Sequence, residues 1–554
     1  MKKRLLWNKA YAKIKCKVKG GKLNKITKYL NQHINGQVFD RPSILKAYSR
    51  DKSVIEVMPR LVAVPTETSD IKFLLRFAND IAAKKFKLPV TVRGAGQSKT
   101  GACLGEGMII STEKLNHIQE VNEHERYVIV QAGVTLEKLN AVLAAYKLCL
   151  PVKANEKETI GGLISTFPTD PYAKKYGSIF YYVERLEVVL SNGDDVQTRS
   201  FTPHVFKNMI RENSGKFAGK VYEKTAGLIE KNRDLIKNIT DNVHATRAGY
   251  PMISKVKNDS TKSFDLTPLF FGAEGTLGVI TEIALRVEPI PRLGKHILAT
   301  FPNLNSANTF MSSVAKLHPA TLDVFDTRIF KIAEKHGKNL GLLEPLIDEG
   351  YYVLVAFDDN FLLSSRKLRQ TLGIGANAAS ITVENNINTD DFKEIHELLR
   401  CYLNDENSVE RPSLVDDFYM SAEGLPKFIE KLKIIEKGLN QELPIFGSFA
   451  TSIYTVRPDF DLSDIADRKR AMQFLRYFGK IVKESGGSFA GGRSEGRVKG
   501  LVSTPELEKN EKEFYKKVKK VFDPHEFMNP ETKLGASFAD VVRHLRTSEA
   551  QGVK

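Results

Sequence analysis

The segment at residues 93–101, Arg-Gly-Ala-Gly-Gln-Ser-Lys-Thr-Gly, carries residue types well suited to binding a charged ligand. It follows residues 88–92, which are apolar enough to form a short buried strand. Gly94, Gly96 and Gly101 let the backbone turn and expose its N–H groups, so no side chain would separate those donors from a pyrophosphate. The spacing matches neither G-x-G-x-x-G nor a P-loop. The loop therefore predicts another nucleotide-binding arrangement or, alternatively, turn structure alone.

Two later segments repeat this chemistry. Gly161 and Gly162 form one, and Gly275 opens the other, which continues as an apolar run to residue 281. Glycine permits close approach to an extended anionic cofactor, and the hydroxyls of Ser165 and Thr166 offer neutral donors beside it. These segments must then be brought together by the fold.

The composition predicts a folded protein of several domains. The chain has 554 residues, is 42% hydrophobic and 27% charged, and contains no apolar run long enough to cross a membrane. Its four cysteines lie far apart, which argues against a disulfide framework or a cysteine-based metal site and favours a cytoplasmic location. The whole chain has a net charge of +17. Residues 1–39 contain eleven Lys and Arg residues and no acidic residue. We interpret this stretch either as a solvated extension or as a peripheral contact with the inner face of an anionic membrane, and we predict no nucleic-acid partner.

Helix and strand signals predict the elements that position the loops. Helices are expected to begin near residues 69 and 135, and strands to occupy 90–92, 108–110, 127–131 and 187–190. Residues 200–260 look helical, strand character returns at 268–290, and prolines near 290 mark a boundary. Beyond it, strands such as 351–357 alternate with helices such as 390–403, and the chain from 471 is predicted to be helical. The expected fold class is α+β.

The order and spacing of seven segments resemble the FAD-linked oxidases and dehydrogenases of the vanillyl-alcohol oxidase/p-cresol methylhydroxylase (PCMH) superfamily. Within it, the chain is most similar to the branch that holds D-lactate dehydrogenase and the flavin-binding chain of glycolate oxidase. The resemblance covers residues 45 to 535 and rests on residues 48–53, 59–65, 93–101, 159–162, 175–177, 271–281 and 522–530.

This resemblance implies a two-lobed FAD-binding PCMH-type domain, an α+β substrate (cap) domain and a helical C-terminal segment that returns to the flavin. The implied boundaries are 1–44 for a basic N-terminal extension, 45–291 for the FAD-binding domain with a helical insertion at about 200–260, 292–470 for the cap, 471–540 for the C-terminal segment and 541–554 for a frayed tail.

The resemblance also implies that the cofactor is FAD, with its adenine side near residues 278–280. No histidine occurs between residues 34 and 116, which excludes the covalent attachment that some superfamily members make in the pyrophosphate loop, so we expect non-covalent FAD. For Arg93, Glu274 and Asn529 a structural role is an alternative to cofactor contact. The implied FAD-binding residues are Arg93, Gly94, Ala95, Gly96, Gln97, Ser98, Thr159, Ile160, Gly161, Gly162, Ser165, Thr166, Tyr176, Gly177, Glu274, Gly275, Gly278, Val279, Ile280 and Asn529.

The chain departs from the branch where the branch binds metal and carries its base. Gly-His-x-Gly-Asp-Gly-Asn-x-His is replaced by Gly-Ser-Phe-Ala-Thr-Ser-Ile-Tyr at 447–454, and Ser-Gly-Glu-His-Gly-x-Gly by residues 490–497, which lack that Glu and His. We therefore predict no metal site. The candidate catalytic residues are Arg493 with Arg497 as a clamp for a substrate carboxylate, Glu495 as a general base, and Tyr454 near the flavin. Alternatively, Arg493, Glu495 and Arg497 pair with one another on a loop.

Three functions are compatible with these residues. The first is dehydrogenation of a small D-2-hydroxy acid, D-lactate or glycolate-like, by hydride transfer to FAD. A quinone, a cytochrome or an electron-transfer protein would then accept the electrons. The second is oxidation of a different alcohol. The third is a non-catalytic FAD-binding subunit that serves as an electron-transfer partner.

Overall fold

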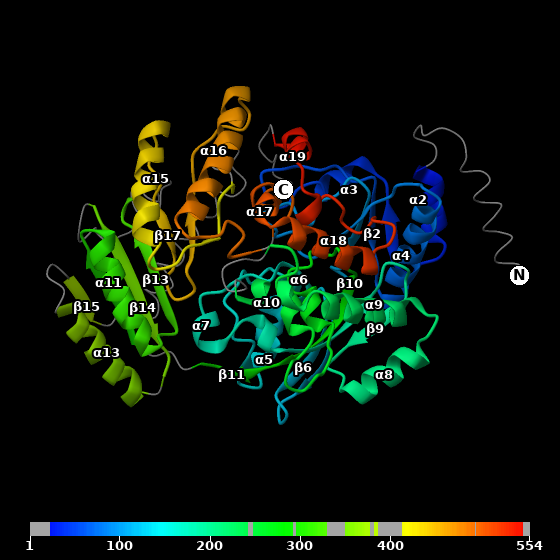
Figure 1. Ribbon diagram of the computed structural model, residues 1–554, viewed down its shortest axis with the longest axis horizontal. Helices are drawn as coiled ribbons and strands as arrows, with labels where there is room; N and C mark the ends of the chain where they lie inside the picture. The colour runs from blue at the N-terminus through cyan, green and yellow to red at the C-terminus, as the bar shows by residue number, and fades with distance from the viewer. Residues whose placement is uncertain are drawn as a thin grey trace, which may run out of the picture.

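The computed structural model describes residues 23–241, 248–291, 295–329, 349–359, 361–376, 382–385, 413–493 and 495–546. The fold is α+β, as predicted, with two lobes that carry the loops 93–101 and 159–162 and a separate cap sheet (Figure 1). Residues 1–22, which include most of the basic stretch, and the helix expected at 390–403 lie outside the described residues.

The first lobe is a four-stranded sheet in the order β1-β2-β4-β3. Strands β2 and β3 each run parallel to β4, and β1 pairs antiparallel with β2. The apolar face of α4, the helix expected near residue 69, is buried on this sheet. The elements are β1 (Gln37–Phe39), α3 (Pro42–Ala47), β2 (Leu61–Val64), α4 (Thr68–Ala83), β3 (Val90–Arg93) and β4 (Met108–Ser111).

Part of the expected N-terminal extension belongs to this lobe. Helix α2 (Leu23–Asn31) precedes β1, and both Leu30 and Val38 are buried in the same core as α4. The expectation of a separate extension at 1–44 is corrected accordingly: from residue 23 on, the chain is folded, because its apolar residues join the core between α4 and the sheet.

The second lobe is a five-stranded antiparallel sheet in the order β5-β6-β10-β8-β9. Strand β10 begins at Val279, later than the strand expected from residue 268, because Glu274 and Gly275 adopt left-handed φ values of 54° and 71° in a turn. The elements are β5 (Ile118–Asn122), β6 (Tyr127–Gln131), α5 (Leu136–Ala144), α6 (Ile160–Thr166), α7 (Ala173–Tyr176), β8 (Val183–Val189), β9 (Asp195–Thr198), β10 (Val279–Arg286) and, in the helical insertion, α8 (Pro203–Glu212), α9 (Phe217–Lys231) and α10 (Arg233–Asp241).

The cap is a seven-stranded sheet in the order β15-β12-β14-β13-β17-β18-β16 with helices packed on its outer face (Figure 1). Alternate residues of the central strands, such as Leu322 and Val324 of β13, join the core beneath these helices. The elements are β12 (Lys295–Phe301), α11 (Leu304–Val314), β13 (Thr321–Asp326), β14 (Tyr351–Phe357), α13 (Phe361–Ala376), β15 (Thr382–Asn385), β16 (Phe418–Tyr419), α15 (Leu425–Leu439), β17 (Ile445–Ser448), β18 (Ile453–Val456) and α16 (Ile465–Glu484). Because α16 buries its apolar face in the cap core, the boundary expected at residue 471 would divide a cap helix.

The C-terminal segment returns to the two lobes. Helix α18 (Lys509–Phe522) follows α17 (Gly500–Glu506) and buries its aromatic residues in the core of the second lobe. Helix α19 (Phe538–His544) extends into the expected tail, and the N–H of Arg546 donates to the carbonyl of Val54 at 2.9 Å. The expectation of a frayed tail from residue 541 is therefore corrected, since the chain is packed through Arg546.

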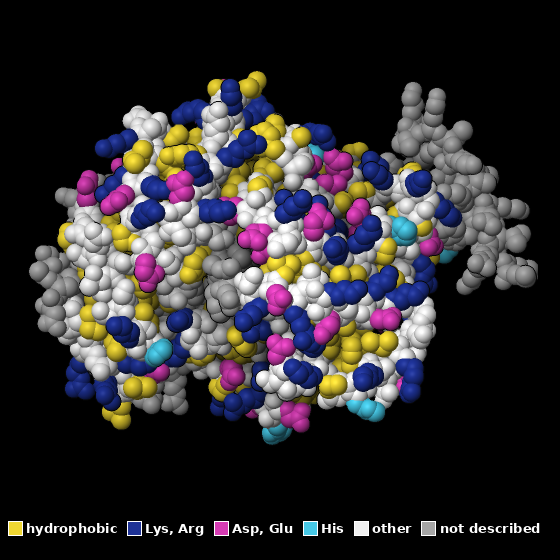
Figure 2. All heavy atoms as spheres, in the orientation of Figure 1, with side chains coloured by type: hydrophobic (Ala, Val, Ile, Leu, Met, Phe, Trp, Pro, Cys, Tyr) yellow, Lys and Arg dark blue, Asp and Glu magenta, His cyan; other side chains and the backbone are white. Residues whose placement is uncertain are grey.

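The surface is mixed in charge. Figure 2 shows Lys and Arg side chains spread over the viewed face, with Asp and Glu among them. Within the described ranges, no helix combines the length and apolar character needed to cross a membrane.

Candidate cofactor and substrate site

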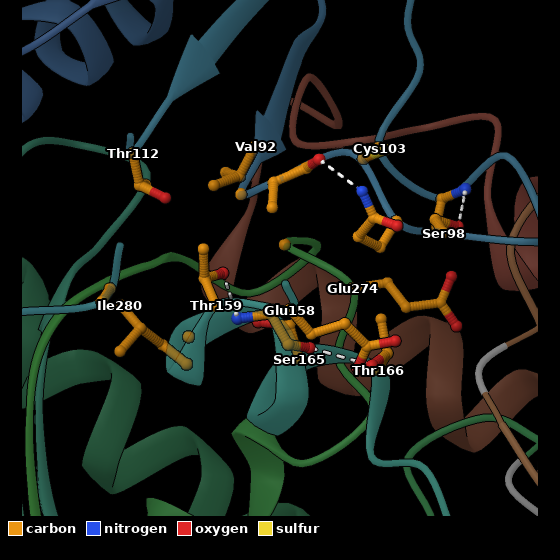
Figure 3. Close-up of a pocket in the computed structure, with 18 of the residues that line it drawn as sticks. Val92, Ser98, Cys103, Thr112, Glu158, Thr159, Ser165, Thr166, Glu274 and Ile280 are labelled. Atoms are coloured by element: carbon orange, nitrogen blue, oxygen red, sulfur yellow. Dashed lines mark hydrogen bonds between the residues drawn. The ribbon is translucent and has the colours of Figure 1, made fainter. Parts of the chain in front are cut away.

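A pocket lies where the two lobes meet the C-terminal segment. Figure 3 shows its labelled side chains around an open space, with Thr112 and Ile280 at one end and Ser98 and Glu274 at the other. The pocket is lined by Val92, Gly94, Ala95, Gly96, Gln97, Ser98, Ala102, Cys103, Thr112, Ala132, Glu158, Thr159, Gly161, Gly162, Ser165, Thr166, Glu274, Gly275, Gly278, Ile280 and Arg493. The three glycine segments predicted from the sequence thus meet in one cavity.

The loop after β3 forms one wall of the pocket. A Cβ on Gly94 would lie 2.3 Å from the Thr159 Oγ1, so only glycine lets this loop approach the start of α6. Gly96 has a φ of 69°, and a Cβ there would collide with the Arg93 guanidinium at 2.2 Å. Arg93 itself lines a second hollow on the other side of the loop and lies 5.4 Å from the Tyr48 ring centroid. This placement favours its role in holding the loop.

Helix α6 forms the opposite wall. Thr159 caps it by accepting a hydrogen bond from the Gly162 N–H at 3.1 Å. A Cβ on Gly161 would lie 2.9 Å from the Ala132 carbonyl, so this glycine packs the helix onto the turn after β6. These contacts leave space and backbone dipoles where an elongated dinucleotide would lie, which fits FAD.

Glu274 anchors the third segment instead of facing the pocket freely. Its carboxylate accepts from the backbone N–H groups of Glu495 and Gly496 at 2.9 and 2.8 Å and lies 3.3 Å from the Lys533 ammonium. Glu495, the candidate base, is fully buried and lies 3.0 Å from the same ammonium. It also accepts from the Gly249 N–H at 2.9 Å and does not line the pocket.

Asn529 ties the pocket together from the C-terminal segment. Its amide donates to the carbonyls of Ala102 and Glu274, both at 2.8 Å, and its oxygen accepts from the Thr91 hydroxyl at 3.1 Å. Asn529 is fully buried and is not among the lining residues. We therefore propose that it positions the first and third FAD-binding segments and does not touch the cofactor.

Arg493 reaches the pocket beside Glu158. Its guanidinium lies 2.6 Å from the Glu158 carboxylate and 3.3 Å from that of Asp417 in the cap. Arg497, its proposed companion in a substrate clamp, is instead fully buried and donates to the Leu104 carbonyl and to the Asp540 carboxylate. The alternative in which Arg493, Glu495 and Arg497 pair with one another is corrected, because each has a different acidic or basic partner.

A charged cluster surrounds Arg493 where the cap meets the FAD-binding lobes. Arg457 lies 2.7 Å and Lys99 lies 3.4 Å from Asp416. Burial opposes ionisation of Asp416, but these two cations outweigh it and hold the pKa of Asp416 below its usual range. The Lys499 ammonium donates to the Asp417 carbonyl at 3.1 Å. Burial lowers the pKa of Lys499 to about 8, against the attraction of the two aspartates.

Tyr454 and Tyr176, both predicted site residues, lie away from the pocket lining. Tyr454 belongs to the core beneath the cap helices, and its burial raises its pKa. The hydroxyl of Tyr176 contacts Asp358, and Lys175 lies 3.1 Å from Asp359, so this segment connects the second lobe to β14 of the cap. Gly177, Ile160 and Val279 shape the backbone around the pocket without lining it.

Matches to family models agree with this geometry. The model for the FAD binding domain matches residues 59–199, and that for the C-terminal domain of FAD linked oxidases matches residues 290–532. The chain therefore carries the FAD binding domain and the C-terminal domain of FAD linked oxidases, and the predictions of this fold and of FAD as the cofactor are confirmed.

The chain is also similar to individual proteins with named activities. The chain is 24% identical over 511 residues to D-2-hydroxyglutarate dehydrogenase of Pantoea ananatis, which covers 87% of this chain but 48% of that protein. It is 25% identical to glycolate oxidase subunit GlcD of Bacillus subtilis (89% of this chain, 92% of that protein) and 25% identical to D-lactate dehydrogenase of Archaeoglobus fulgidus (87% and 94%). Substrate-bound p-cresol methylhydroxylase shares the fold, with a TM-score of 0.66 at 12% identity over 94% of this chain and 98% of that chain. The chain thus spans about half the length of the D-2-hydroxyglutarate dehydrogenase.

Sequence reasoning missed Glu158 and Cys103 as lining residues. Glu158 directly precedes the segment at 159–162, but its partner Arg493 lies 335 positions later in the chain. Cys103 looked like an isolated cysteine. Burial raises the pKa of its thiol to about 12, so the group is neutral beside the cofactor.

Proposed function

We propose that this protein is an FAD-dependent dehydrogenase of a small D-2-hydroxy acid, such as D-lactate or glycolate. The proposal rests on the position of Arg493. This residue lines the FAD pocket, and its guanidinium forms an ion pair with Asp417 of the cap. A substrate between the pocket and the cap would meet this guanidinium, which suits a carboxylate.

The charge of the surrounding cluster supports an anionic substrate. Its cations are Lys99, Arg457, Arg493 and Lys499, and its carboxylates are Glu158, Asp416 and Asp417. At neutral pH this leaves one positive charge in excess. In a partly buried site an unbalanced charge attracts a single anion, and a neutral alcohol would leave it uncompensated.

The protein's contribution to the reaction is position and charge. FAD supplies the hydride acceptor when it is bound. The backbone of residues 94–98 and helix α6 would hold its pyrophosphate. The Glu158 and Asp417 carboxylates fix the Arg493 guanidinium, so that a substrate carboxylate meets a preset donor.

Attachment of FAD is proposed to be non-covalent. No histidine lines the pocket within the described parts of the chain. The lining thiol, Cys103, donates a hydrogen bond to Asp51, and its raised pKa disfavours the thiolate that would attack a flavin.

The first experiment is an absorption spectrum of the purified protein followed by anaerobic addition of D-lactate. We expect a flavin band that bleaches with D-lactate or glycolate. Propane-1,2-diol is the matched control, because it keeps the hydroxyl of lactate but lacks the carboxylate. Equal bleaching by the diol would favour oxidation of a different alcohol. A flavin band that none of these compounds bleaches would favour a non-catalytic FAD-binding subunit.

The Arg493→Met variant tests the carboxylate site. We expect a KM for D-lactate raised at least tenfold, about 1.4 kcal/mol of lost binding, with FAD retained. An unchanged KM for D-lactate would show that Arg493 does not bind the substrate.

A further inference from the structure

Asp323 is a buried carboxyl group with no hydrogen-bond partner for either oxygen among the described residues. It lies on β13 between Leu322 and Val324, whose side chains face the cap helices. Because side chains alternate along a strand, the Asp323 side chain points away from these helices, on the inner face of the cap sheet. Directly opposite on β17, the Ser448 hydroxyl likewise lacks a hydrogen bond of good geometry, although it lies close enough to lower the pKa of the Asp323 carboxyl. Buried polar groups are normally hydrogen-bonded, and an exception indicates an occupant such as water or a ligand. The inner face of the cap therefore offers an acceptor and a hydroxyl to whatever lies beneath it.

This inner face continues to Arg493. Ser448 is paired with Ile453 across the β17–β18 hairpin. Ile453 in turn contacts the backbone of Gly492, where an added Cβ would lie 2.8 Å from its Cγ2. Gly492 precedes Arg493, which lines the FAD pocket. Neighbouring strands are about 4.8 Å apart, so Asp323 lies about two strand spacings from Ile453 along this face.

The second lobe faces Asp323 from the other side. The Lys153 ammonium and the Tyr172 hydroxyl both interact electrostatically with the Asp323 carboxyl. Asp170, which accepts hydrogen bonds from the N–H groups of Lys153 and Tyr172, is a second buried acid on this side. Asp323 is thus enclosed between the cap and the segment that leads into α7.

We propose that the Asp323 carboxylate accepts the proton of the substrate hydroxyl, with Ser448 beside it as a hydrogen-bonding partner of the same oxygen. This inference rests on the proposed dehydrogenase function. As the C–H bond of the carbinol breaks, bound FAD would supply the acceptor for the hydride and its two electrons. The O–H bond breaks, its proton moves to an Asp323 oxygen, and the electron pair left on oxygen forms the carbonyl of the 2-oxo acid. Arg493 would hold the carboxylate of the same substrate at the other end of this face.

The environment of Asp323 suits a general base at neutral pH. Burial raises its pKa to about 7, and the nearby Ser448 hydroxyl and Lys153 ammonium offset only part of this effect. A base whose pKa lies near the working pH is both available in its ionised form and able to take up a proton. Glu495, by contrast, is held by Lys533, Gly249 and Ser503.

The test compares Asp323→Asn with Thr321→Val. Asparagine keeps the size of the aspartate but cannot accept the proton. Thr321 is buried on the same face, two residues earlier, and its replacement by valine removes a hydroxyl without removing a titrating group. We expect the rate of anaerobic flavin reduction by D-lactate to fall about 100-fold or more in D323N and to stay within about threefold of wild type in T321V.

Product binding gives a readout that does not depend on turnover. Protonated Asp323 can donate a hydrogen bond to the carbonyl oxygen of pyruvate, whereas the carboxylate repels that oxygen. Wild-type affinity for pyruvate, followed by the perturbation of the flavin spectrum, should therefore fall about tenfold per pH unit above pH 7, and D323N should bind pyruvate with little change over the same range.

The outcomes separate the two proposals. If D-lactate reduces the wild-type flavin but D323N reacts within about threefold of wild type, or D323N and T321V slow equally, the role of Asp323 is refuted and the dehydrogenase function stands. A pH-independent affinity for pyruvate in the wild type also refutes it. If no 2-hydroxy acid reduces the wild-type flavin, the proposed function fails, and the assignment of Asp323 as its proton acceptor fails with it.

Discussion

Replacing Lys533 with methionine should destabilise the protein, because it removes the counter-ion of two buried carboxylates, those of Glu495 and Glu274. The Lys533 ammonium lies 3.0 Å from Glu495 and 3.3 Å from Glu274. The side chains of both glutamates are 0% exposed and that of Lys533 is 2% exposed. Methionine has a similar length and fills the same space, but it leaves two like charges together without a counter-ion.

The size of the effect follows from this burial. Removing one partner of a buried ion pair costs about 3–5 kcal/mol, because the remaining charge stays desolvated. Here the remaining carboxylates also repel each other. Burial already raises the pKa of Glu274, and loss of the Lys533 cation would raise it further. In the variant the Glu274 carboxyl therefore takes up a proton at a higher pH than in the wild type. The loss should be about 3–5 kcal/mol near pH 8 and should shrink toward pH 5 as the charges disappear.

The assay is urea unfolding at saturating FAD, followed by far-UV circular dichroism at pH 8 and pH 5. The control is Lys516→Met, which removes a lysine that is 53% exposed and pairs with Glu513 on the surface, and which should cost about 1 kcal/mol or less. Because Glu274 belongs to the pocket wall, FAD should also bind at least about tenfold more weakly to K533M, measured by the fluorescence of free FAD. A loss below about 1 kcal/mol at pH 8, or a loss independent of pH, would refute the reasoning.

Four further outcomes can be measured. Gly161→Ala places a Cβ 2.8 Å from that of Ala132 and should weaken FAD binding at least about tenfold. The control Gly227→Ala, whose Cβ would have nothing within 4 Å, should leave FAD bound and stabilise its helix by up to about 1 kcal/mol. Equal losses of FAD binding in the two variants would contradict this account. Because the pKa of Asp323 is raised to about 7 in the folded state, its ionisation destabilises the fold increasingly between about pH 4 and 7. D323N should therefore gain stability relative to wild type over that range, by up to about 4 kcal/mol. A stability difference that stays constant with pH would argue against a buried titrating group at this position. Acid precipitation should release all flavin into the supernatant, and a yellow pellet would show covalent attachment. If the basic stretch contacts membranes, deleting residues 2–22 should reduce flotation with anionic liposomes, and unchanged flotation would exclude that role.

The cofactor half of the site could be predicted from the sequence because it depends on local backbone chemistry. Gly94, Gly96 and Gly161 occupy positions where a Cβ would collide with neighbours, so their spacing is visible without the fold. The strands and helices around them also have clear periodicity, as α4 and β6 illustrate. Short-range rules sufficed for this part.

The roles of charged residues could not be predicted in the same way. Glu495 was predicted to be a base because it lies in the segment at 490–497 that replaces the motif of the resembled branch, but its partners are Lys533, Gly249 and Ser503 from other segments. Asp323 carried no motif, and only the sheet register places it opposite Ser448. Ionic partners far apart in the chain leave no local pattern, so spacing alone cannot pair them.

The two halves of the site therefore tolerate change to different degrees. FAD would be held by backbone groups whose positions depend on Asn529, Glu274 and Lys533, none of which needs to contact the substrate. Substitutions in the cap can then alter the proton acceptor and the substrate anchor while the cofactor cradle is preserved. This separation would let the substrate side of the site change while the FAD pocket stays intact. It also means that FAD binding alone is no measure of catalysis here, and that the identity of the base must be tested at the cap, beginning with Asp323.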